Sequence, residues 1–261
     1  MRPIITLTTD FGIDDPFVGI MKGVILNICP NAEIIDLTHS IAPQNLSQAV
    51  YALQASVSYF PENTIHLAVV DPGVGSNRRG LAIKTNKYFF IGPDNGIFSP
   101  FLENFPVVEL TNQEVFLKPI SKTFHGRDIF APAAAWIANG EPIEKLGKTL
   151  EKPMPLTFSK PKLIDHCLKG ELIYRDRFGN LTSNISKDLL TKSFGDNLED
   201  IKIFLNNQKE IPLVSHYELG LKQSLTALIN SWDQVEIFCS EGNASESFNI
   251  SVGDSIEIKR N

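Results

Sequence analysis

The sequence predicts an α/β domain with a mainly parallel sheet, followed by a smaller, mainly β domain. Short apolar runs at residues 4–7, 32–35 and 65–70 alternate with two amphipathic helical patterns, as in a parallel sheet with crossover helices. Residues 141–168 are rich in proline and charge, which is typical of a linker. From residue 169 onward, short β-like runs alternate with turns. We therefore expect an N-terminal domain at 1–150, a linker at 151–168 and a C-terminal domain at 169–261.

The helices and strands follow from local spacing. Pro16 favours a helix start, and the apolar residues that follow it recur at helical intervals. A second helix is expected at 45–59, a hairpin at 81–85 and 88–91, and a third helix at 128–139 before Gly140. In the C-terminal domain we expect strands at 171–174, 201–204, 235–239 and 255–258.

Composition excludes several classes of protein. The 261 residues are 43% hydrophobic and 21% charged, which is ordinary for a globular protein. A net charge of −6 argues against a nucleic-acid surface, and no apolar run reaches the roughly 18 residues of a membrane span. The N-terminal segment is too short and polar for a signal peptide, so we expect a cytoplasmic protein without membrane attachment.

The first polar segment after a predicted strand is Thr8-Thr9-Asp10-Phe11-Gly12-Ile13-Asp14-Asp15. Ligand sites of parallel sheets lie beyond the carboxyl ends of the strands, so Asp10 is a candidate ligand-binding residue. A carboxylate there can accept hydrogen bonds from two ribose hydroxyls. The segment also partly resembles the calcium-binding aspartates of nucleoside hydrolases, although its spacing differs from theirs and calcium needs 6–8 oxygen ligands.

Two further segments carry groups that can activate a water molecule. Asp71-Pro72-Gly73-Val74-Gly75 follows the third predicted strand and ends at Ser76-Asn77-Arg78-Arg79, so an aspartate and an arginine can pair across one loop. His125 lies just before the third predicted helix, and histidine titrates near neutrality. A surface turn and a structural histidine are the alternatives.

A fourth segment lies in the C-terminal domain and joins two strands. In Arg175-Asp176-Arg177-Phe178-Gly179-Asn180, the Phe178 ring can stack on a base, and Asn180 can hydrogen-bond a base edge or a sugar. A hairpin turn with a core phenylalanine is the alternative.

Taken together, these segments resemble the S-adenosyl-L-methionine (SAM) hydrolase family that forms adenosine, also called SAM hydroxide adenosyltransferases, which are relatives of fluorinase and chlorinase. The matching motifs are TTDFG at 8–12, DPGVGS at 71–76, FHGRDIFAP at 124–132, RFGNLTSNI at 177–185 and EGNAS at 241–245. Each motif is weak alone, but all five in this order are specific.

The resemblance implies a Rossmann-like N-terminal domain, a barrel-like C-terminal domain and a homotrimer with active sites at subunit interfaces. It implies that Asp71, Arg78 and His125 activate a water, and that Asp10 binds the ribose. The remaining substrate-binding positions that it implies are Asp176, Phe178, Asn180, Ser231, Glu236, Asn243 and Ala244, with the backbone at 239–241 near the adenine. SAM is then the substrate, and no metal or other cofactor is expected.

Two positions distinguish hydrolysis from halogenation within this resemblance. Fluorinase-like members have a tyrosine where this chain has Asp71 and a halide-binding serine where it has Gly126. An anionic Asp71 repels a halide and favours a polarised water. We expect a SAM hydrolase, with a chlorinase-like halogenase and a non-catalytic sensor of adenosine or SAM as alternatives.

Overall fold

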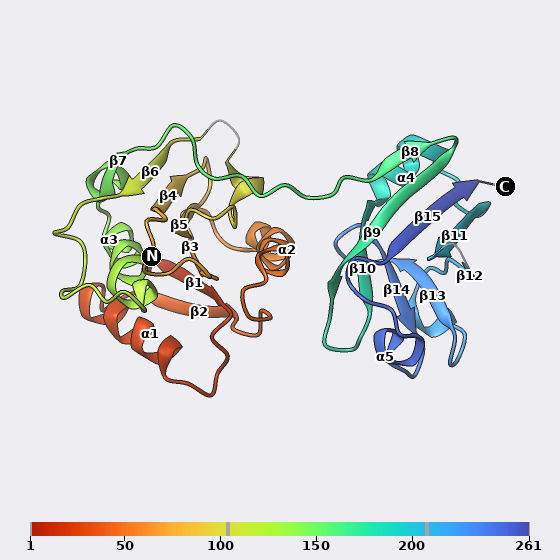
Figure 1. Ribbon diagram of the computed structural model, residues 1–261, viewed down its shortest axis with the longest axis horizontal. Coiled ribbons are helices and arrows are strands. Elements are labelled where there is room, and N and C mark those ends of the chain that lie inside the picture. The colour runs from red at the N-terminus through yellow and green to blue at the C-terminus, as the bar shows by residue number, and fades with distance from the viewer. Residues whose placement is uncertain (1, 103–104, 207–208, 261) are drawn as a thin grey trace. The chain divides into compact units, whose positions relative to one another are not determined.

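The computed structural model describes residues 2–102, 105–206 and 209–260. The chain forms two compact units, Met1–Thr157 and Phe158–Asn261, each with its own sheet and buried core (Figure 1). The predicted linker, residues 151–168, contains the division between them.

The first unit is built on a seven-stranded sheet in the order β2-β1-β3-β5-β4-β6-β7. Its elements are β1 (Ile4–Thr9), α1 (Phe17–Ile28), β2 (Glu33–Thr38), α2 (Leu46–Ser56), β3 (Ile65–Val69), β4 (Gly80–Lys84), β5 (Phe89–Pro93), β6 (Val107–Leu110), α3 (Ala131–Ala138) and β7 (Gly147–Thr149). The alternation of strand and helix predicted for the first 70 residues is confirmed.

This sheet is mixed, so the expectation of a mainly parallel, Rossmann-like sheet is only partly met. Strands β2, β1, β3 and β5 run parallel, whereas β4 is antiparallel to both β5 and β6, and β7 is antiparallel to β6. The reason lies in the connections: the chain between β4 and β5 is far shorter than the dozen residues that a parallel crossover needs.

Helices α1 and α3 pack on one face of the sheet, and α2 lies on the other (Figure 1). Met21 and Ile25 of α1 are fully buried against Ile5 and Leu7 of β1. The third helix starts earlier than the predicted residue 128, because a π-helical turn over Gly126–Phe130 leads into α3. His125 therefore lies at the start of a helical segment in which Gly126, Asp128 and Phe130 are buried.

The segment at 154–156 is attached to the rest of the first unit around the buried Asp94 side chain, which pairs with Arg79. The Arg79 guanidinium donates to Asp94, whose side chain is 1% exposed. Asp94 also accepts the Met154 amide at 2.7 Å, and Ser99 Oγ accepts the Leu156 amide at 2.7 Å. These bonds keep the backbone at 154–156 on the first unit.

The second unit contains one eight-stranded sheet that nearly closes into a barrel, in the order β12-β11-β15-β9-β10-β14-β13 with β8 beside β9. Its elements are β8 (Lys162–Ile164), β9 (Cys167–Arg175), β10 (Leu181–Ser186), α4 (Lys187–Phe194), β11 (Ile201–Leu205), β12 (Lys209–Ile211), β13 (Leu225–Ile229), β14 (Gln234–Cys239), α5 (Ala244–Phe248) and β15 (Ser255–Arg260). The sheet edges meet where Ala227 of β13 donates to the Pro212 carbonyl just after β12. This mainly β architecture and its barrel-like sheet agree with the sequence prediction.

Across the part of the chain that the structure describes, none of the helices is both long and apolar enough to cross a membrane.

Glycine at position 96 is required by a close approach. Gly96 has φ +91°, and a Cβ built there would lie 2.5 Å from Leu156 Cβ. We expect Gly96→Ala to destabilise the protein by about 1–3 kcal/mol more than the left-handed backbone alone would cost. Gly140→Ala is the matched control, because Gly140 has φ +86° with open space around it. Urea unfolding of both variants measures the difference, and equal losses would show that Leu156 does not press on this turn.

Candidate active site

Two aspartates leave neighbouring strands at one edge of the first unit's sheet. Asp10 directly follows β1, and Asp71 lies two residues after β3, which pairs with β1 in parallel. Because parallel strands end at the same edge, both side chains reach one cavity of about 390 Å³, which His125 also lines.

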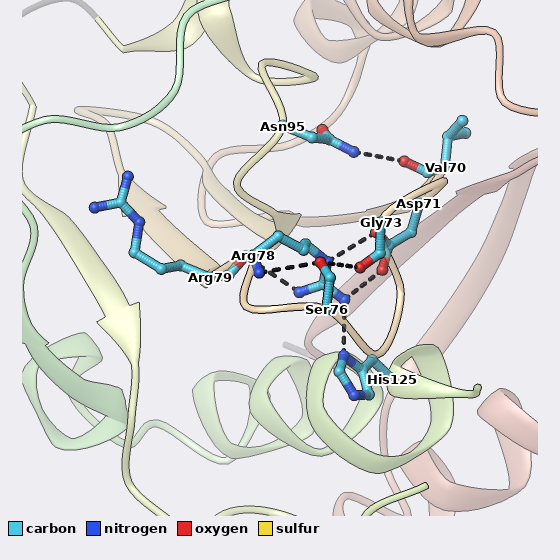
Figure 2. A network of polar contacts seen from close by, with 8 residues as sticks. All are labelled: Val70, Asp71, Gly73, Ser76, Arg78, Arg79, Asn95 and His125. Carbon is cyan, nitrogen blue, oxygen red and sulfur yellow. Dashed lines mark hydrogen bonds and ion pairs between the residues drawn. The ribbon is translucent and has the colours of Figure 1, made fainter. Parts of the chain in front are cut away.

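Asp71, Arg78 and His125 form a continuous polar network (Figure 2). Arg78 Nε donates to Asp71 Oδ1 at 2.8 Å, and Arg78 Nη2 donates to both Asp71 Oδ2 and His125 Nδ1, the latter at 2.8 Å. The side chains of Asp71 and Arg78 are only 5% and 9% exposed. The guanidinium also packs over the Phe130 ring, 5.0 Å from its centroid. This is a bidentate, charge-assisted pair with a histidine bound to its outer edge.

The loop between Asp71 and Arg78 folds back on itself through local hydrogen bonds. Val74 and Ser76 amides donate to the carbonyls of Asp71 and Gly73. Gly75 has φ +77°, and a Cβ there would lie 2.1 Å from the Lys122 carbonyl oxygen, so only glycine lets the loop approach the segment that carries His125. The loop sequence thus brings the three functional groups together.

The hydrogen bonds of His125 define its protonation state. A guanidinium can only donate, so His125 Nδ1 must accept from Arg78, and the ring proton lies on Nε2. Burial lowers the pKa of His125, and the Arg78 charge lowers it further, while Asp71, Asp128 and a backbone hydrogen bond to Ser121 act in the opposite direction. His125 is therefore neutral at pH 7.

Asp128 supports this arrangement from within the π-helical turn. Its side chain is fully buried, accepts the Ser121 amide at 2.7 Å and pairs with Arg127. Because the same Ser121 backbone hydrogen-bonds the His125 ring, Asp128 fixes the segment on which His125 rests.

Asp10 is held by the loop that follows β2. Its Oδ2 accepts the Gln44 amide at 2.8 Å, and Gln44 adopts φ +64°, an uncommon conformation outside glycine. Gln44 lines the cavity as well. Sequence reasoning did not identify Gln44, because nothing in its local pattern indicates a left-handed residue facing an aspartate 34 positions away.

Aromatic rings form much of the cavity wall. Phe11, Phe17 and Phe124 pack on one another with ring centroids 5.3–6.0 Å apart, and all three line the cavity. Phe17, at the start of α1, is 41% exposed. Such an apolar wall around a few polar groups is typical of a small-molecule site.

In the second unit, five predicted substrate-binding residues gather at one end of the sheet. Asp176 accepts the backbone and side-chain amides of Asn180 at 2.9 and 3.1 Å, which closes the turn between β9 and β10. The Gly179 carbonyl of this turn accepts the Ser245 amide, which brings the start of α5, with Asn243 and Ala244, beside it. Phe178 at the tip of the turn is 75% exposed.

Glu236 lies opposite Thr182 in the neighbouring strand, two residues after Asn180, whereas Ser231 lies at the far end of β14. Ser231 precedes β14, whereas Asn243 follows it. The two ends of a strand of this length lie about 17 Å apart. Glu236 is 4% exposed and accepts from Tyr217 at 2.7 Å and from Asn230 at 3.1 Å, all within the second unit. The residues at 239–241 end β14 beside the cluster.

In the ranges that the structure describes, no three His, Cys, Asp or Glu side chains are grouped as a metal site would require.

Comparison with known proteins relates both units to one family. Residues 5–147 match the SAM hydroxide adenosyltransferase N-terminal domain, and residues 170–257 match its C-terminal domain. The chain belongs to the SAM hydroxide adenosyltransferase family. The family resemblance predicted from the five motifs is therefore confirmed.

Individual relatives cover almost the whole chain. It is 39% identical to the (R)-S-adenosyl-L-methionine hydrolase of Methanocaldococcus jannaschii over 98% of this chain and 95% of that protein. It is 25% identical to the fluorinase of Nocardia brasiliensis over 99% and 97% of the two chains. The crystal structure of an uncharacterized conserved protein from Thermotoga maritima superposes with a TM-score of 0.90, at 36% identity over 98% of this chain and 100% of that one.

The neutral state of His125 in this family member can be measured. We expect its ¹⁵N NMR signals to show the proton on Nε2 and to titrate below the ordinary value of 6.5, because burial and Arg78 disfavour the imidazolium. Asp128→Asn should lower this pKa further, because the Asp128 charge raises it. A proton on Nδ1, or titration above 6.5, would contradict the hydrogen-bond assignment.

Proposed function

We propose that this protein hydrolyses SAM to adenosine and L-methionine by in-line attack of a water molecule at C5′. The observation that carries the proposal is the Asp71 carboxylate, which is oriented by a buried Arg78 and lines the same cavity as Asp10. Relatives that cover nearly the whole chain are named (R)-S-adenosyl-L-methionine hydrolases, which supports this substrate.

The chemistry of SAM places few demands on the protein. The bond that breaks joins C5′ to a positively charged sulfur, so the leaving group departs as the neutral thioether of methionine and needs no general acid. Water supplies the new C5′–O bond and releases one proton. The site therefore has to hold water in line with C5′ and accept that proton, and positioning of this kind lowers a barrier by about 7–11 kcal/mol.

Asp71 is the proton acceptor in this mechanism. His125 Nδ1 is occupied by Arg78, and the opposite nitrogen carries the ring proton, so His125 has no free lone pair to act as a base. Arg78 does not line the cavity, and it orients the Asp71 carboxylate through its two hydrogen bonds. His125 in turn restrains the free edge of Arg78.

Substrate binding is assigned to both units. Asp10 accepts the ribose hydroxyls, and Phe178, Asn180, Asn243 and the Ala244 backbone contact the adenosine. Asp176 is the candidate for the methionine amino group, whereas Ser231 and Glu236 stay predictions for the methionine end. SAM is the substrate, and no further cofactor takes part.

Hydrolysis is favoured over the two alternatives. A side chain at position 126, where fluorinase-like members resemble one another in having serine, would place its Cβ 3.1 Å from Met21 Sδ and 3.2 Å from the Phe124 ring. That crowding and the anionic Asp71 disfavour a halide site. A non-catalytic sensor of adenosine or SAM would not need a proton acceptor such as Asp71, which the buried Arg78 orients.

The names of the relatives also specify the sulfur configuration. We expect the (R)-epimer of SAM to be consumed faster than the (S)-epimer, with adenosine and methionine released in equal amounts and with no effect of a chelator or of halide. Chromatography of products from each epimer measures this. Formation of free adenine, a chlorinated nucleoside or equal rates for the epimers would contradict the assignment.

Variants separate the roles of the three polar residues. Asp71→Asn should lower kcat by about 10²–10⁴, the usual contribution of a general base, while adenosine still binds. His125→Asn retains an acceptor where Nδ1 lies, so its kcat should stay well above that of Asp71→Asn, whereas Asp10→Ala should mainly raise KM. Steady-state kinetics measures all three, and a His125→Asn variant as slow as Asp71→Asn would identify His125 as the base.

The active protein is a homotrimer in which the first unit of one subunit and the second unit of its neighbour share each site. The proposed catalytic residues all precede the linker, and the proposed base-contacting residues all follow it. Head-to-tail interfaces of this kind close into rings. The Phe178 ring is 75% exposed and is therefore available to contact a neighbouring subunit.

Complementation tests the shared site. Inactive Asp71→Ala and inactive Asn180→Ala chains, mixed under conditions of proven subunit exchange, should regain activity, because some interfaces then combine two unmutated halves. Sedimentation checks the trimer. An exchanged mixture that stays inactive, or an active monomer, would overturn the shared-site arrangement.

A further inference from the structure

Two buried histidines are hydrogen-bonded to threonines of the same strand, β1. Thr6 Oγ1 lies 2.8 Å from His66 Nδ1, and Thr9 Oγ1 lies 2.8 Å from His39 Nδ1. All four side chains are buried, and none belongs to the catalytic network. The two pairs differ in what surrounds them.

The His39 ring lies between Thr9, to which it is hydrogen-bonded, and an ion pair of Asp36 with Lys22. Its Nε2 lies 3.0 Å from Asp36 Oδ1, and Lys22 donates to Asp36 Oδ2 at 2.6 Å. Because Nε2 faces a carboxylate, it carries the ring proton, and Nδ1 accepts the hydroxyl proton of Thr9. The Thr9 oxygen then accepts the Phe11 amide at 3.3 Å.

These contacts involve the residues on both sides of Asp10 in the sequence. Thr9 precedes Asp10 and Phe11 follows it, and the Gly12 amide donates to the His39 carbonyl at 2.9 Å. The loop that begins with His39 ends at Gln44, whose amide donates to Asp10 itself. The ring and the carbonyl of His39 therefore fix the backbone from which the Asp10 carboxylate projects.

His66 makes no comparable contact. It packs among the rings of Phe60, Tyr88 and Phe90, with centroids 5.3–5.6 Å away, and burial lowers its pKa to about 4. Its threonine lies four residues before Asp10. His66 is thus a matched buried histidine that stabilises the core without touching the Asp10 segment.

We infer that His39 is a positioning residue for Asp10, held in place by Asp36 and Lys22 and dedicated to the nucleoside end of the site. The inference rests on the proposed function in one respect, which is that Asp10 binds the ribose. A ribose contact exists in both the ground state and the transition state, so a misplaced Asp10 weakens binding more than it slows turnover.

Substitution of the two histidines tests this. His39→Gln keeps a donor toward Asp36 but loses the acceptor for Thr9, and we expect it to weaken adenosine binding about tenfold, the effect of a lost hydrogen bond, with kcat at saturation changed much less. His39→Asn, which keeps an acceptor near Nδ1, should restore much of the affinity. His66→Gln should lower the unfolding midpoint while adenosine binds as in the unmodified protein. Calorimetric titration with adenosine and urea unfolding give these values.

Equal loss of affinity in His66→Gln and His39→Gln, or unchanged affinity in His39→Gln, would overturn the inference. If His39→Gln folds poorly, Asp36→Ala offers a variant at a side chain that is 43% exposed. It removes both oxygens that face His39 and Lys22, so it should weaken adenosine binding in the same direction. Unchanged affinity in Asp36→Ala would count against the inference.

A further measurement separates this inference from the proposed function. Hydrogen exchange of the Phe11 and Gly12 amides should accelerate in His39→Gln and stay unchanged in His66→Gln, whatever ligand Asp10 binds. If Asp10→Ala leaves adenosine affinity intact, the ribose assignment fails, while the exchange data still decide whether His39 positions this segment.

Discussion

The buried ion pair between Asp71 and Arg78 is the interaction on which the rest of the site depends. Two charges removed from water are costly unless every polar atom finds a partner, and here the guanidinium is satisfied by Asp71, by His125 and by the Arg79 carbonyl at 3.1 Å. These partners come from two segments, the loop at 71–79 and the segment that carries His125, and the Asn95 side chain adds a bond to the Val70 carbonyl just before Asp71 (Figure 2). Loss of one partner would leave a buried charge without a hydrogen-bonding partner, which is costly. The ion pair therefore constrains the loop, the π-helical turn and the neighbouring strand ends together.

The same pair explains how a site without strong acids or bases suits a sulfonium substrate. A neutral thioether leaves without protonation, so the protein needs one acceptor for the proton of water and a fixed line of attack. In the proposed mechanism the Asp71 carboxylate supplies the acceptor, and neutral His125 adds no positive charge to a cavity that would admit a cation. Gly126 leaves this wall without a side chain, since any Cβ there meets Met21 and Phe124. We propose that charge at Asp71 and space at Gly126 separate hydrolase from halogenase chemistry.

The sequence predicted the elements whose signals are local. The helix after Pro16, the hairpin of β4 and β5, and the strand ends that carry Asp10 and Asp71 follow from periodicity and turn residues. The motifs indicated the candidate catalytic network by resemblance. Strands β6 and β7 were not predicted, because their pairing joins segments that lie far apart in the sequence. Gln44 and His39 were missed for the same reason: their roles arise from contacts with residues 30 or more positions away. Long-range partners of this kind leave no pattern within a window of sequence.

In the proposed mechanism, water activated by Asp71 attacks C5′ and the C5′–S bond breaks. Hydrolysis of SAM in H₂¹⁸O, followed by mass spectrometry of both products, tests this step most directly. We expect one ¹⁸O atom in the 5′-hydroxyl of adenosine and none in methionine, and we expect Asp71→Asn to form labelled adenosine only as slowly as it turns over SAM. Label in a product derived from the methionine chain, or labelled adenosine formed by Asp71→Asn at the rate of the unmodified protein, would contradict this mechanism.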